Sequence, residues 1–124
     1  MIQKFNDLPW HDAELKGIII EREQKENVRI LVRWPNYFGE QDVFIGFTDC
    51  YAFQSDMHFG IMPPEFILEA KCISESQELD NIKKIWAKMG LDLSELHCYR
   101  IITNPTNSTI NIFALSFQII NIKS

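Results

Sequence analysis

The sequence predicts a single α+β domain over residues 1–124, with a mostly antiparallel sheet of about six strands and one amphipathic helix packed against it. Three observations predict this class. Short runs of β-branched and aromatic residues recur along the chain between turn-forming residues. One later segment instead carries apolar residues at helical spacing. The length of 124 residues and the apolar share of 46% fit one domain with its own core.

The first two strands are predicted to form a hairpin. Residues 14–21 contain the run Ile18-Ile19-Ile20. In residues 28–34, Val28, Ile30 and Val32 alternate with Arg29, Leu31 and Arg33. The short charged connection at residues 22–27 lets the two strands pair antiparallel. Pro35 ends the second strand, because proline has no N–H to donate to a ladder.

The middle of the chain contains two further strands. Residues 43–47 are apolar and aromatic, which predicts a strand, and residues 50–53 continue or follow it. Residues 65–74 fit two structures. The preceding Pro64 could occupy the first position of a helix, but apolar and polar side chains alternate, so a strand is preferred.

The helix is predicted over residues 76–89. Acidic residues near its start and Lys88 near its end suit the helix dipole, and Gly90 is the expected stop. The apolar positions recur at steps of three and four, so they are expected to share one buried face: Leu79, Ile82, Ile85, Trp86 and Met89.

A second hairpin is predicted at the end of the chain. Residues 96–103 and 109–120 flank the dense cluster of turn-forming residues at 104–108. In the last strand, one set of alternating side chains is expected on a single face: Phe113, Leu115, Phe117 and Ile119.

Composition and charge exclude several classes of function. The formal charge of −5 argues against a nucleic-acid-binding protein, which normally needs a basic face. Neither a signal peptide nor an apolar run of membrane-spanning length is present, so no membrane role is predicted. The odd number of cysteines (Cys50, Cys72 and Cys98) without CxxC spacing favours a reducing compartment, the cytoplasm, and buried structural roles for the thiols.

A candidate polar site combines His11, Asp12, Asp56 and His58. With further acids at Asp42 and Asp49, these side chains could line a cleft and serve as general acids and bases in a small hydrolase. The chain has none of the phosphate-loop, dinucleotide-binding, nucleophile-elbow or H-E-x-x-H motifs. A site must be argued from convergent groups, so no catalytic, cofactor or metal role is assigned, and a non-enzymatic function is favoured.

A candidate contact surface consists of Trp34, Tyr37, Phe38 and Asp42. The two central aromatic residues fall in a predicted loop between Pro35 and Gly39. Exposed aromatic side chains are enriched at protein interfaces, so this segment is the best physical indication of a binding surface.

The first 75 residues resemble a group of small bacterial domains. Leu8-Pro-Trp-His-Asp-Ala-Glu-Leu15 matches a "His-Asp-Ala/Ser" element before the first strand, and Val43-Phe-Ile-Gly-Phe-Thr-Asp-Cys50 matches the group's apolar strand. This pattern is similar to the immunity protein 50 family of bacterial toxin systems and to the related YxiG-like domains. The resemblance implies a non-catalytic cytoplasmic protein that binds and neutralises a toxin. An acidic protein would suit a basic toxin, because opposite charges steer association.

The sequence therefore leaves three functions open. A protein-binding domain with a toxin as its partner is favoured. The alternatives are the small hydrolase and a structural homodimer paired through sheet edges.

Overall fold

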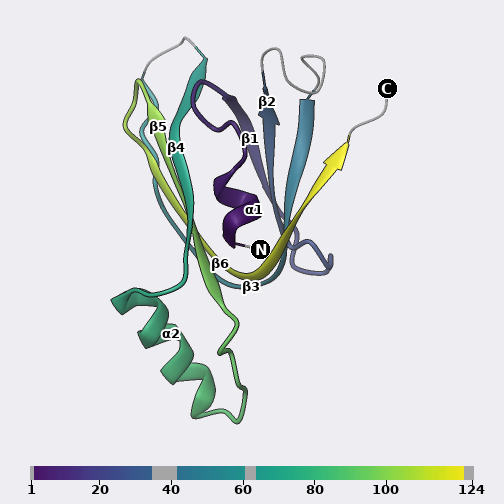
Figure 1. The fold of residues 1–124 in the computed structure, drawn as a ribbon, viewed down its shortest axis with the longest axis vertical. Coiled ribbons are helices and arrows are strands. Elements are labelled where there is room, and N and C mark those ends of the chain that lie inside the picture. Colours follow the sequence, from purple (N-terminus) through teal and green to yellow (C-terminus); the bar gives the residue numbers. More distant parts are fainter. Residues whose placement is uncertain (1, 35–41, 61–63, 122–124) are drawn as a thin grey trace.

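The computed structural model describes residues 2–34, 42–60 and 64–121. Within these ranges, six antiparallel strands close into a barrel in the order β1-β2-β3-β6-β5-β4 (Figure 1). A short helix lies among the strands, and a longer one stands beyond one end of the barrel. In chain order the elements are α1 (Ile2–Asn6), β1 (Glu14–Ile20), β2 (Val28–Arg33), β3 (Asp42–Asp56), β4 (Glu65–Ile73), α2 (Gln77–Ala87), β5 (His97–Asn104) and β6 (Thr109–Asn121).

The predicted α+β class is wrong, because the sheet closes on itself into a barrel. The six antiparallel strands are present, but they surround the main core on all sides. In the predicted fold, the core would instead lie between an open sheet and the helix that covers it. Closure depends on β1 meeting β4, two strands about 50 residues apart in the sequence. Alternation of side chains within a strand does not reveal such a long-range pairing.

The local hairpins and the ambiguous strand follow the prediction. β1 pairs with β2 from Ile20↔Val28 onward, and β5 pairs with β6 across the turn after Asn104. Residues 65–73 form strand β4, which decides the helix-or-strand question in favour of the strand. No helix in the described part of the chain is long and apolar enough to cross a membrane.

Strands β3 and β6 are long and bent, and each belongs to both sides of the barrel (Figure 1). Their register shifts between Cys50 and Ala52, beside Asp49 with its positive φ of 55°. Phe117 consequently lies in the main core, whereas Phe113 packs in a second cluster. The four side chains expected on one face therefore pack in two places: Phe113 and Leu115 in the second cluster, and Phe117 and Ile119 in or against the main core.

Helix α1 fills the interior of the barrel. Its Phe5 is fully buried, and its ring centroid lies 4.9 Å from that of Tyr99 and 5.0 Å from that of Phe117. The chain then turns back, and Trp10 Nε1 donates a 2.8 Å hydrogen bond to the Phe5 carbonyl. Nothing in the sequence analysis indicated this helix, since five residues are too few to show a helical period.

Helix α2 is shorter than predicted and only partly buried. The Ser76 side chain caps it by accepting a 3.1 Å hydrogen bond from the Leu79 N–H. Leu79 is buried in the second cluster, but Ile85 and Met89 are 58% and 71% exposed. The prediction of a single buried face fails for these two residues.

Candidate functional site

The described structure leaves one side of strand β1 largely unpaired. On this side β1 meets β4 at Glu14↔Phe66 and Leu15↔Glu65, and no further pair with β4 follows among the described residues. On its other side β1 is paired with β2 as far as Ile20. Among the described residues, the segment from Lys16 to Ile20 is therefore a sheet edge within a barrel that is otherwise closed.

The pairing with β2 fixes which backbone groups point to the open side. The Glu21 N–H donates a 2.9 Å hydrogen bond to the Asn27 carbonyl. Hydrogen-bonded and non-hydrogen-bonded pairs alternate along an antiparallel ladder. The pair Ile19↔Arg29 is consequently hydrogen-bonded. Ile18 and Ile20 must then direct their N–H and C=O groups away from β2, toward the open edge.

A cleft of about 370 Å³ lies along this edge. One wall is the β1 segment itself, and the other follows the end of β3, where Phe59 is 78% exposed. At Gly17, which lines the cleft, an added Cβ would meet nothing within 4 Å, so a side chain there would have space in front of the strand's face. The lining residues are Leu15, Lys16, Gly17, Ile18, Met57, His58, Phe59, Glu65, Thr106 and Ser108.

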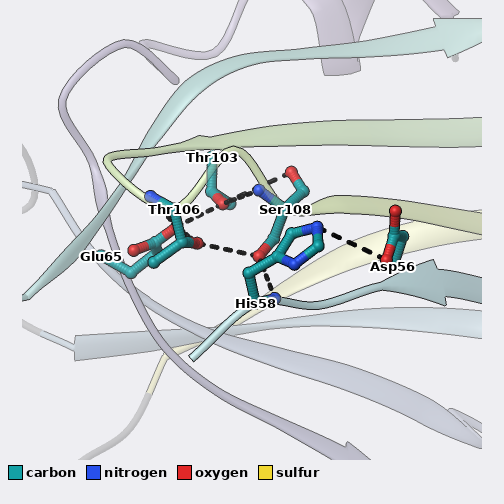
Figure 2. Close-up of polar contacts among 6 residues, drawn as sticks. All are labelled: Asp56, His58, Glu65, Thr103, Thr106 and Ser108. Atoms are coloured by element: carbon teal, nitrogen blue, oxygen red, sulfur yellow. Dashed lines mark hydrogen bonds and ion pairs between the residues drawn. The ribbon is translucent and has the colours of Figure 1, made fainter. Parts of the chain in front are cut away.

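A directed chain of hydrogen bonds borders the cleft (Figure 2). The His58 backbone N–H donates to Ser108 Oγ at 2.8 Å, and Ser108 Oγ lies 2.8 Å from Thr106 Oγ1. Thr106 Oγ1 in turn donates to the Glu65 carboxylate. Because Thr106 gives its hydroxyl proton to Glu65, Ser108 must donate to Thr106. Every hydroxyl proton in this chain is therefore committed.

The carboxylate of Glu65 is the end point of this network. Its Oε2 atom also accepts from Thr103 Oγ1 at 2.5 Å and from the Thr106 N–H at 3.3 Å. No described residue donates to the second oxygen, Oε1. The network thus connects the start of β4 to the β5–β6 turn and fixes the orientation of the carboxylate at the cleft.

The structure brings Asp56 and His58 of the candidate polar site together. His58 Nε2 lies 3.5 Å from Asp56 Oδ1, and both side chains are more than half exposed. The contact of His58 with Ser108 is made by the backbone N–H and not by the ring. The hydroxyl proton of Ser108 points to Thr106, so the imidazole is not placed to accept it. This geometry is not that of a hydroxyl nucleophile paired with a histidine base.

His11 and Asp12 lie together at a separate place, in the turn before β1. His11 Nε2 is 3.6 Å from Asp12 Oδ1, and His11 Nδ1 lies 3.1 Å from the Leu68 carbonyl. Asp12 has a φ of 68°, which suits a turn. No described hydrogen bond or ion pair links these residues to Asp56 or His58. In the described part of the chain, no group of three His, Cys, Asp or Glu side chains could hold a metal ion.

Of the predicted contact surface, the structure describes only Trp34 and Asp42. Trp34 is 1% exposed and lies in the core, with its ring centroid 5.4 Å from that of Trp10. Tyr37 and Phe38 lie outside the described residues. Asp42 accepts a 2.6 Å hydrogen bond from Arg33 Nε, which is the main cause of the lowered pKa of its carboxyl group.

Asp42 also neutralises the lysine of the cleft. Its Oδ2 atom lies 3.5 Å from Lys16 Nζ. The side chains of Lys16 and Asp42 are 29% and 27% exposed, so this ion pair is partly shielded from water.

The cysteines are not placed for chemistry. Cys72 and Cys98 are buried, which raises the pKa of each thiol to about 11, and burial also raises the pKa of the half-buried Cys50. Thiols with raised pKa values are poor nucleophiles near neutral pH. The expected structural role therefore fits the two buried cysteines.

Of the residues that line the cleft, the sequence pointed to His58 as a candidate site residue but not to Glu65, Thr106 or Ser108. Glu65, Thr106 and Ser108 belong to two segments about 40 residues apart, and no motif connects them. One signal was available for the edge: the run Ile18-Ile19-Ile20 is strongly β-forming and contains neither proline nor charge. A comparison with models of protein families finds no match to this chain, and neither does a comparison with curated proteins.

Proposed function

We propose that this protein is a non-catalytic binding domain that takes up an extended segment of a protein partner along the open edge of β1. The observation that carries the proposal is the direction of the backbone N–H and C=O groups of Ile18 and Ile20, which face the open edge without a described partner. Ile18 also lines the cleft. An added strand would satisfy these groups, and strand addition at a sheet edge is a common mode of peptide recognition.

The side chains around the edge support an interaction with an apolar segment. Ile20 is 56% exposed and Phe59 78% exposed, and both lie beside the edge or its cleft. Proteins usually protect an edge strand with charge, proline or a cover. The single charge on this edge, Lys16, is held by Asp42 at 3.5 Å. The edge is thus suited to binding.

The resemblance to immunity proteins suggests the kind of partner. A toxin bound in the cytoplasm would fit the acidic charge of −5 and the free cysteines, which favour a reducing compartment. We therefore propose a toxin as the partner, the cytoplasm as the compartment and a function without catalysis.

A Gly17→Trp variant tests the proposal, because it places a large side chain in the open space beside the edge. The matched control is Ala87→Trp on the exposed side of α2, beyond the other end of β4. Immobilised wild type and both variants are exposed to an extract of the source cells, and bound proteins are quantified by mass spectrometry. The partner should bind wild type and Ala87→Trp but not Gly17→Trp.

The captured protein is then produced alone. If it is a toxin, its expression arrests growth, and co-expression of wild type but not of Gly17→Trp restores growth. Equal capture by Gly17→Trp, with unchanged circular dichroism, would contradict binding at the edge. A wild-type dimer in light scattering that Gly17→Trp converts to a monomer would assign the edge to a second copy of the chain and overturn the proposed partner.

A further inference from the structure

We infer that the partner segment carries an arginine or lysine side chain that pairs with Glu65, so that the cleft selects a basic segment. This inference rests on the proposed function, and it adds the chemistry of the segment that the cleft selects. It follows from the position of Glu65 at the end of the open edge and from the hydrogen bonds that Thr103, Thr106 and Ser108 already make.

Glu65 stands where β4 stops covering β1. Leu15↔Glu65 is the last described pair between the two strands. A segment added along Lys16–Ile20 lies beside the start of β4, so one end of the segment comes close to Glu65. A side chain near that end lies within reach of the carboxylate, which lines the same cleft as Gly17 and Ile18.

Hydrogen bonds hold the Glu65 carboxylate in one orientation, and its Oε1 atom can still accept a hydrogen bond. The Oε2 atom is held by Thr103 Oγ1, the Thr106 N–H and Thr106 Oγ1, whereas no described donor reaches Oε1. A guanidinium or ammonium group donates to carboxylate oxygens in charge-assisted hydrogen bonds. Since Glu65 is already fixed by its neighbours, pairing with a cation requires little reorganisation on this side.

An acidic or neutral acceptor would find no matching donor among the described hydroxyl groups of the cleft. The proton of Thr106 is given to Glu65, and that of Ser108 to Thr106. Lys16 is engaged with Asp42, and a second carboxylate, Asp56, stands beside His58. Like charges brought together at an interface are unfavourable, so these groups oppose an anion and favour a cation.

Synthetic peptides with the sequence Ser-X-Thr-Val-Thr-X-Ser provide the test, with X as arginine, norleucine or glutamate. One X stands near each end, so that either orientation of the peptide can place X beside Glu65. Their affinity for wild type is measured by titration calorimetry. We expect the arginine peptide to bind about tenfold more tightly than the norleucine peptide, because a hydrogen-bonded charge pair is formed, and the glutamate peptide to bind most weakly. The preference for arginine should weaken as salt is added.

Two variants locate the selection. Glu65→Gln keeps the size and one acceptor oxygen but removes the charge, and it should abolish the preference for arginine. Glu69→Gln, on the same strand at an exposed position where the glutamate contacts Lys71 at 3.9 Å, is the matched control and should keep it.

The outcomes separate this inference from the proposed function. Equal binding of all three peptides that Gly17→Trp abolishes would overturn the basic selection and leave the edge as the binding site. An arginine preference that survives in Glu65→Gln would also overturn it. Binding unaffected by Gly17→Trp, or no binding of any peptide at about 1 mM, would contradict the edge itself.

Discussion

At the scale of single residues, Asp42 shows how charge is arranged beside the binding edge. It joins three strands, because it contacts Arg33 of β2 and Lys16 of β1 from the start of β3. This arrangement pairs Lys16 with Asp42 and leaves Glu65 as the carboxylate that lines the cleft. In the proposed binding mode, Asp42 thus removes a positive charge that would compete for Glu65.

The lowered pKa of Asp42 predicts a pH-dependent effect of Asp42→Asn. The hydrogen bond from Arg33 is the largest cause, so the folded pKa lies below the ordinary value of 3.8. Stabilisation by the carboxylate is fully present above that value and is lost as the pH falls through the folded pKa. The variant should lose about 0.5–1 kcal/mol of unfolding free energy at neutral pH, since the ion pairs are partly exposed.

The measurement is urea unfolding of wild type and variant at several pH values between about 2 and 7. Other carboxyl groups titrate in both proteins and cancel in the difference. The difference should shrink below pH 3.8, the ordinary pKa of the group. A difference that stays constant down to the lowest pH would mean that the charge of Asp42 does not stabilise the fold.

At the scale of elements, β1 is the strand whose two sides differ. One side is paired with β2, and in the described part of the chain the other side is covered by β4 only at its beginning. The sequence of β1 predicted a strand correctly, but it could not show this asymmetry. Whether a strand has one neighbour or two depends on where distant strands end, and periodicity within seven residues carries no such information.

Amide hydrogen exchange should therefore alternate along β1. The N–H groups of Ile19 and Glu21 point to β2 and should exchange slowly, whereas those of Ile18 and Ile20 point to the open edge and should exchange rapidly. Two-dimensional NMR of the protein transferred into D₂O measures all four amides together. Equal protection of neighbouring amides would show that the edge is paired in solution.

At the scale of the whole molecule, aromatic side chains fill the interior of the barrel, and the segment that contains α1 supplies one of them and pairs with β4. Phe5 contacts the rings of Trp10, Phe47, Tyr99 and Phe117. The segment after α1 also pairs with β4, since the Ile67 N–H donates a 2.7 Å hydrogen bond to the Ala13 carbonyl. The N-terminal segment thus fills the interior and connects to the strand that closes the barrel.

Phe5→Ala should accordingly destabilise the entire barrel. Loss of a fully buried phenylalanine costs about 3–5 kcal/mol, through lost burial and the cavity that remains. The matched control is Phe59→Ala, which removes the same side chain from a position that is 78% exposed and should change stability by about 0.5 kcal/mol or less. Urea unfolding measures both. Equal effects of the two substitutions would contradict the role of α1 as the interior of the barrel.

The sequence by itself determined the local elements. Alternation and turn-forming residues predicted the two hairpins and the strand at 65–73, and helical spacing with Gly90 as the stop predicted α2. These features depend on neighbours within a few residues, so a short stretch of chain contains the information. The limits of α2's buried face were not predictable, because exposure of Ile85 depends on where the barrel ends.

Only the tertiary structure decided that the sheet closes, that Phe5 occupies its interior and that Glu65 stands at the open edge of β1. Each of these depends on the sum of strand bends and registers over the whole chain, such as the shift at Cys50 that turns β3 around the barrel. A change of one residue in register would move every side chain to the other face. The position of the cleft is therefore a property of the closed barrel and of no single segment.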